Sequence, residues 1–167
     1  MKTKFYWQQR FPAHRTVVLT HSYRPVTGQF VFTAYDLETH PGDSAFAAKD
    51  YCLNDGTLAT ARAKLAAKKK HPDQAEELTA YLTDYVLKSA NNWNGPIGRF
   101  HLTLDKVKPD NILSLCWDGN LVHITPTEAE TTLRNFAPAQ DLHMLVLEDT
   151  PKDMTATPSS RRNSFIT

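Results

Sequence analysis

The sequence predicts a mainly β fold: an antiparallel sandwich or partly open barrel with one helical insert over about residues 56–70. Two observations predict it. Several short runs carry apolar residues at alternate positions between turn residues, and only one stretch has the three- and four-residue apolar spacing of a helix. Strands joined by short turns favour antiparallel pairing over a parallel α/β sheet. An α+β arrangement is the alternative.

Three strands are predicted in the N-terminal part of the chain. Residues 4–11 are rich in aromatic side chains and end at Pro12, which cannot donate a ladder hydrogen bond. Residues 15–24 alternate regularly between two faces, as a half-buried strand does. The β-rich residues 29–34 follow a turn at 25–28, so the last two strands are expected to form a hairpin.

A helical insert is predicted over residues 43–71, where alanine, lysine and leucine dominate. Asp55 is the predicted N-terminal cap, and apolar residues then recur at helical spacing as far as Ala66. The lysines at 68–70 precede Pro72, which ends the helix. Because these lysines meet the negative end of the helix dipole, the basic run needs no nucleic-acid ligand to explain it.

The second half of the chain is expected to be mostly strands. They are predicted at residues 78–87, 99–106, 112–117, 121–125, 131–136 and 141–148. A helix beginning near Asp73 competes with the first of them. Residues 91–98, dense in asparagine, glycine and proline, are predicted to form a loop. Asp118-Gly119 is a strong hairpin signal between the two strands that flank it.

Composition sets limits on organisation and partners. Residues 1–149 are expected to form one domain, and residues 150–167, rich in proline, threonine, serine and arginine, a disordered tail. The formal net charge of +1 provides no general attraction to nucleic acid. No apolar run approaches the roughly 20 residues of a membrane-spanning helix. Polar residues 8–10 stand where a signal peptide would have its apolar core, so no export signal is expected in this polypeptide.

The two cysteines, Cys52 and Cys116, match neither a Cys-x-x-Cys redox motif nor a zinc pattern. From the residues themselves, a long-range disulfide in an oxidising compartment and two buried free thiols in a reducing one are equally open.

Several stretches carry a family resemblance. They are Phe5-Tyr6-Trp7 with Phe11-Pro12, His21-Ser22-Tyr23-Arg24-Pro25 with Gly28, Tyr51-Cys52, Asn92-Trp93-Asn94-Gly95-Pro96-Ile97-Gly98-Arg99-Phe100 with Leu102, Leu115-Cys116, Pro126-Thr127 with Glu130, and Phe136 with Asp141-Leu142. Over about residues 5–148 the chain thus resembles the later part of the bacterial family catalogued as domain of unknown function 4424.

The resemblance implies a periplasmic or secreted setting for the intact family protein, and therefore a disulfide between Cys52 and Cys116. It implies no activity. Proteins of this family usually have a signal peptide and an N-terminal half that are absent from the printed sequence. Pairing with such a half, or self-association, is therefore an expected mode of assembly.

The sequence predicts no catalytic residue and no cofactor. Four histidines lie on predicted strands, namely His21, His101, His123 and His143. They form no His-Glu-x-x-His or His-x-His pattern, so unrelated half-buried histidines are favoured over a metal site. There is no Gly-x-Ser-x-Gly elbow, and a Cys52 paired with Cys116 is no nucleophile. A metal-dependent enzyme using the strand histidines is the alternative.

The predicted loop supplies the candidate ligand-binding residues. Asn92, Trp93 and Asn94, together with Trp117, offer the amides and aromatic faces that sugar and peptide sites use. A purely conformational role for the loop is the competing interpretation, because glycine and proline fix its backbone. The function expected is a non-catalytic binding or envelope-structural module, with an envelope component or a protein as partner.

Overall fold

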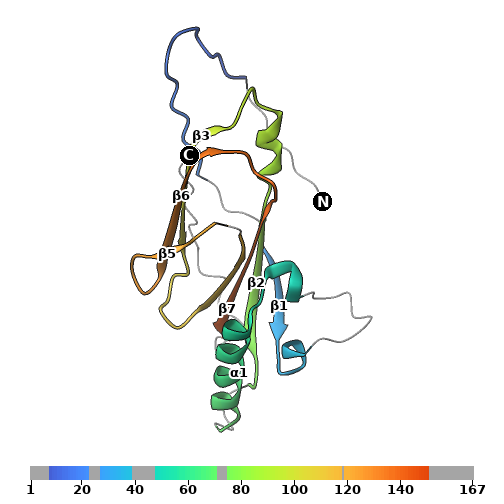
Figure 1. Cartoon of the computed structure of the whole chain (residues 1–167). Helices are drawn as coiled ribbons and strands as arrows, with labels where there is room; N and C mark the ends of the chain where they lie inside the picture. Colours follow the sequence, from blue (N-terminus) through green and yellow to red (C-terminus); the bar gives the residue numbers. More distant parts are fainter. Residues whose placement is uncertain (1–7, 23–26, 39–47, 71–74, 118, 151–167) are drawn as a thin grey trace.

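The computed structural model describes residues 8–22, 27–38, 48–70, 75–117 and 119–150. Within these ranges the chain forms two antiparallel sheets, one α-helix and three short 3-10 helices (Figure 1). The sheets do not close into a barrel. The predicted fold class, a mainly β sandwich with one helical insert, is confirmed.

The first sheet has four strands in the spatial order β1-β2-β7-β4. Their bounds are Gly28–Phe32 for β1, Leu78–Tyr85 for β2, Leu142–Asp149 for β7 and Ile112–Cys116 for β4. The long pair β2 and β7 forms the centre, and β4 lies at one edge with β7 as its partner. The runs predicted at 29–34, 78–87, 112–117 and 141–148 are therefore strands.

The second sheet has three strands in the order β3-β6-β5. Their bounds are Ile97–Asp105 for β3, Glu128–Phe136 for β6 and Val122–His123 for β5. They match the runs predicted at 99–106, 131–136 and 121–125, with β6 beginning three residues earlier than expected. Inside the predicted loop 91–98, the 3-10 helix η3 (Lys88–Asn92) contributes the first two residues.

Two apolar clusters hold the layers together, one on each face of the first sheet. The helix α1 (Asp55–Lys69) places Ala61 and Leu65 against one face, where they pack with buried residues such as Leu145 and Leu147. The other face packs on the second sheet. Members of this second cluster include Leu87, Phe100, Leu102, Leu104, Leu142, Leu113 and Leu115. Since successive strand residues point to opposite faces, the central strands contribute to both clusters.

The N-cap of the helix lies one residue before the predicted cap. Asn54 is the N-cap, and its Oδ1 accepts a hydrogen bond from the amide of Thr57 at 2.9 Å. Asp55, predicted to cap, is instead the first helical residue, where its charge still favours the positive end of the dipole. Lys68 and Lys69 lie in the last turn, as predicted.

The first two predicted N-terminal strands, at residues 4–11 and 15–24, are wrong wherever the structure describes them. Residues 8–11 and 15–22 form no strand. Val18 is 82% exposed, and none of the described strands pairs with this segment, so the regular alternation here matches no buried face. The predicted hairpin of 15–34 is also absent, because β1 pairs with β2. The remaining residues of these predictions, including the turn at 25–26, lie outside the described residues.

Two other predictions are contradicted by the described residues, and two fall outside them. The helix that competed for residues near 78 is not formed there, since these residues are β2. The Asp118-Gly119 hairpin is wrong, because β4 and β5 belong to different sheets. The start of the helical insert at 43–47 and the tail from 151 onward lie outside the described residues.

Candidate functional site

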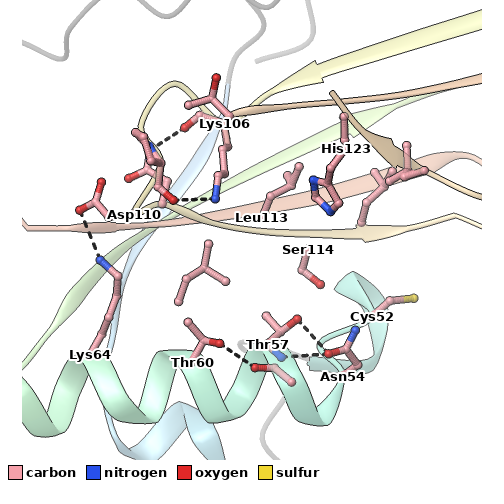
Figure 2. A pocket seen from close by; sticks show the side chains of 18 residues that line it. Cys52, Asn54, Thr57, Thr60, Lys64, Lys106, Asp110, Leu113, Ser114 and His123 are labelled. Carbon is pink, nitrogen blue, oxygen red and sulfur yellow. Dashed lines mark hydrogen bonds and ion pairs between the residues drawn. The ribbon is translucent and has the colours of Figure 1, made fainter. Parts of the chain in front are cut away.

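A groove of about 750 Å³ lies beside β4, between α1 and the second sheet (Figure 2). It is named here the β4 groove. It is lined by Cys52, Asn54, Gly56, Thr57, Thr60, Lys64, Lys106, Pro109, Asp110, Asn111, Ile112, Leu113, Ser114, Leu115, Leu121, His123, Thr127 and Ala129.

The groove runs along the outer edge of β4. Residues 112–115 all contribute to its lining, although their side chains alternate between the two faces of the sheet. Ile112 packs in the cluster under α1, whereas Leu113 and Leu115 pack in the cluster under the second sheet. A cavity that contacts four successive strand residues in this way follows the edge of the strand and not one of its faces.

The N-terminal half of α1 forms one wall. Thr57, Thr60 and Lys64 recur at helical spacing and therefore lie on one side of the helix, the side that faces β4 in Figure 2. The Thr60 hydroxyl donates to the carbonyl of Gly56 at 2.8 Å, which keeps this side chain against its own helix. This wall of the groove is polar.

The loop before β4 closes one end. Asn111 is only 2% exposed. Its side-chain amide nitrogen donates to the backbone carbonyl of Lys106 at 2.7 Å and to the carboxylate of Glu148 at 3.0 Å. The Lys106 ammonium donates to the carbonyl of Pro109 at 2.7 Å. These bonds fix the loop, because a buried amide left unpaired would cost about 1–3 kcal/mol.

An ion cluster joins this end of the groove to α1. Lys64 lies 3.4 Å from Asp110 and 3.2 Å from Asp149, and Lys68 lies 3.3 Å from Asp149. Burial by itself would raise the pKa of Asp149, but hydrogen bonds and charge from the two lysines outweigh it, so this pKa is lowered. Lys64 is therefore neutralised within the structure, whereas Lys106 has no carboxylate partner among the described residues.

The opposite end is closed by a disulfide between Cys52 and Cys116. The bond ties the segment before α1 to the last residue of β4. The Ser114 hydroxyl adds a second tie by donating to the carbonyl of Tyr51 at 2.7 Å. Cys52 has a φ of 54°, in the left-handed region, so the chain turns sharply here before it enters the helix.

A row of polar side chains continues from the disulfide across the first sheet. Cys116 stands opposite His143, and His143 stands opposite Asp84. The Nδ1 atom of His143 lies 2.8 Å from a carboxylate oxygen of Asp84. Burial first, and then the charge of Asp84 and a hydrogen bond to it, raise the pKa of Tyr51. The row orients a histidine, but the neighbouring sulfur is held in a disulfide and is no free thiolate.

The strand histidines do not meet. His101 lies on β3, where its ring contacts the Thr132 hydroxyl at 2.7 Å, and His143 pairs with Asp84 on the first sheet. His123 lines the β4 groove, and His21 lies in the irregular N-terminal segment. Over the described ranges, no three His, Cys, Asp or Glu side chains are placed to hold one metal ion.

The predicted ligand-binding residues lie on different elements. Asn92 ends η3, and Trp93 follows it with 67% of its surface exposed. Trp117 is partly buried and packs on Phe100 and Phe136, with ring centroids 5.7 and 5.6 Å away. No ring contact joins the two tryptophans within the described part of the chain. Asn94 lies in the bend between η3 and β3.

The Trp117 indole also fixes the backbone after β4. Its Nε1 is buried without a hydrogen-bond partner among the described residues, and the ring lies directly over Gly119. A Cβ added at Gly119 would come within 2.9 Å of the indole Cε2. Glycine is required here by close approach and not by a turn conformation.

Comparison with known proteins identifies the family. A sequence model described as domain of unknown function (DUF4424) matches residues 1–145 of the chain. The chain belongs to this family. No curated protein and no solved structure matches it. Within this DUF4424 chain, the Cys52–Cys116 disulfide that the family resemblance implied is present.

Sequence reasoning missed the β4 groove of this DUF4424 member. Its α1 wall consists of threonines and a lysine, and in the sequence these residues indicate only a solvent-exposed helix face. Its other wall comes from β5 and β6, whose position relative to β4 depends on pairing that no local pattern specifies.

Within the described ranges, no helix has the length and apolar character to cross a membrane.

Proposed function

We propose that this chain is a non-catalytic binding module of an exported bacterial protein, and that it binds its ligand in the β4 groove. The groove itself is the observation that supports this most directly. Its volume of about 750 Å³ lies in the range of ligand sites. Ten of its 18 lining residues are polar or charged, so it offers hydrogen-bonding groups beside the apolar residues of β4.

The exported setting is supported by the disulfide. Structural disulfides persist in oxidising compartments and are rare in the cytosol. The Cys52–Cys116 bond joins segments 64 residues apart and closes one end of the groove. A periplasmic or secreted location therefore suits both the stability of the fold and the shape of the proposed site.

The chemistry of the groove favours binding over catalysis. The Ser114 hydroxyl donates to the Tyr51 carbonyl, so it is not activated by a base, and the Cys52 sulfur is in a disulfide. We expect the ligand to be an envelope component or another protein chain. Asn92, Trp93, Asn94 and Trp117 stay a predicted second contact surface, to be tested by substitution once a ligand is known.

The proposal is tested with the purified oxidised chain and three probes: a disaccharide-peptide fragment of peptidoglycan, phosphatidylglycerol vesicles and reduced carboxymethylated casein as an unfolded polypeptide. We expect one class to raise the melting temperature, because a ligand at 100 times its Kd adds about 2.7 kcal/mol. Mass spectrometry should show that this ligand is unchanged.

Two matched helix variants locate the binding. Thr60→Trp fills the groove, whereas Ala59→Trp adds the same side chain at an exposed neighbouring position that does not line it. Thr60→Trp should abolish the ligand-induced shift and Ala59→Trp should retain it. A shift that survives Thr60→Trp would place binding elsewhere. Turnover of a probe that is lost on a histidine or cysteine substitution would show an enzyme instead.

A further inference from the structure

We infer that the ligand of the β4 groove is an extended polypeptide segment that pairs with the open edge of β4 as a fifth strand of the first sheet. This inference rests on the proposed function, because it names the ligand class for the same groove. It goes further by stating which atoms of the chain make the recognition: the backbone of residues 112–115.

On the outer edge of β4, residues 112–115 have backbone groups with no described strand beside them. β4 pairs with β7 on one side, and no described strand lies on its other side. In an antiparallel pair, hydrogen-bonded and non-hydrogen-bonded residues alternate, so about half of the N–H and C=O groups of an edge strand point away from its partner. Among the described residues, those at 112–115 make no backbone hydrogen bond outside the sheet. A row of such groups is matched best by another extended backbone.

The edge is recessed, which favours one added strand over open-ended stacking. Natural edge strands are usually protected by charge, proline or a bulge. The β4 sequence, Ile-Leu-Ser-Leu-Cys, contains neither a charge nor a proline. The α1 wall and the β5–β6 turn flank it instead. At about 3.4 Å per residue, five residues span roughly 17 Å, so the segment recognised is about five residues long.

The two walls differ chemically and therefore select an alternating segment. On the side of the second sheet the lining includes the apolar residues Leu113, Leu121 and Ala129, beside the polar His123 and Thr127. On the α1 side it is polar, with Thr57 and Thr60. An added strand would direct successive side chains to opposite walls. A segment with apolar residues at every second position and small polar residues between them matches both.

Charge defines one end of the segment. Lys64 and Lys106 face Asp110 in the lining, an excess of one positive charge with histidine neutral. Lys64 already pairs with two carboxylates, whereas Lys106 donates to a neutral carbonyl and has no carboxylate partner in the described part of the chain. An acidic side chain on the ligand, at the end beside the loop before β4, would complement Lys106.

The probes are capped hexapeptides of alternating valine and threonine with an aspartate at one end, made in both chain directions. Each is also made in two N-methylated forms, one with the methyl groups on the valines and one with them on the threonines. In a paired strand, the N–H groups of alternate residues point to the same edge. One methylation pattern thus removes the donors that face β4, and the other leaves them intact.

Binding is measured by isothermal titration, and amide hydrogen exchange at residues 112–116 is followed by NMR on the oxidised full chain. We expect one parent peptide to bind and to slow exchange at these amides. One methylation pattern should weaken binding about tenfold or more, since two or three hydrogen bonds are lost, and the other should change it little. Lys106→Glu should weaken binding of the aspartate peptide about two- to fivefold and strengthen that of a lysine-ended peptide.

Other outcomes overturn the inference in distinguishable ways. If both methylated peptides bind as well as the parent and Thr60→Trp abolishes all three, the groove is a binding site but strand pairing is wrong. If no peptide slows exchange at 112–116 while another probe class binds in the groove, the ligand is not a polypeptide strand. If self-association of the chain protects these amides without peptide, the occupant is a second copy.

Discussion

Removal of the Cys52–Cys116 disulfide should cost about 4 kcal/mol of folding free energy. The bond closes a loop of 64 residues, and the loop-closure relation converts this length into a denatured-state entropy of about 14 cal/mol/K, or about 4 kcal/mol at 25 °C. Single domains of this size are stable by roughly 5–15 kcal/mol. The bond therefore supplies a large part of the stability.

The assay is urea unfolding, followed by tryptophan fluorescence and circular dichroism, of the oxidised wild type and of the Cys52→Ala, Cys116→Ala double variant. With an m-value near 2 kcal/mol/M, a loss of 4 kcal/mol lowers the midpoint by about 2 M. Each single variant should lose as much as the double variant, because either one removes the cross-link.

A double variant within about 1 kcal/mol of the wild type would refute the loop-closure reasoning. Single variants that differ widely from the double variant would show that side-chain packing at one cysteine, and not the cross-link, dominates. In that case the disulfide would no longer explain how the segment before α1 is held against β4.

Two further predictions concern single residues. Asp141 accepts hydrogen bonds from the amides of Leu87 and Lys88 at 2.8 and 2.9 Å, and the bond from Lys88 is the main cause of its lowered pKa. Because the folded pKa is depressed, the ionised carboxylate stabilises the fold above the ordinary value of about 3.9, and this is lost as pH falls. The melting-temperature difference between wild type and Asp141→Asn should shrink below about pH 4; a difference that stays constant down to about pH 3 argues against it. Gly119→Ala should displace the Trp117 indole, shift its fluorescence and cost about 1–3 kcal/mol, whereas an unchanged emission spectrum and midpoint would contradict the close approach.

The sequence predicted correctly those elements in which the spacing of apolar residues coincides with a buried face of the element. In β2, Leu78 and Ala80 lie on the α1 side and are fully buried, so alternation in sequence coincides with a real core face. In α1, Ala61 and Leu65 face the same core at the helical spacing that predicted them. In both cases the period of the sequence and the geometry of burial agree.

Alternation predicted a strand wrongly over residues 15–22, a segment that pairs with none of the described strands. Residues 15–22 carry the same period-two pattern as β2, yet Val18 and Leu19 are 82% and 37% exposed. A strand needs a neighbouring edge for its hydrogen bonds, and nothing in the pattern states whether one is present. The loop residues Asn92 and Trp93 have the same difficulty, because their chemistry is visible in the sequence but their neighbours are not.

The pairing of β4 is the error with a functional consequence. A hairpin through Asp118-Gly119 would have placed β5 against the outer edge of β4 and satisfied its backbone groups. Both faces of β4 are packed, under α1 and under the second sheet, whereas Val122 of β5 is 63% exposed. β4 is therefore buried on both faces, whereas β5 is largely exposed, and the two strands belong to different sheets. This separation leaves the edge of β4 open between two walls, so the site proposed for the ligand lies where a strong local hairpin signal, Asp118-Gly119, fails.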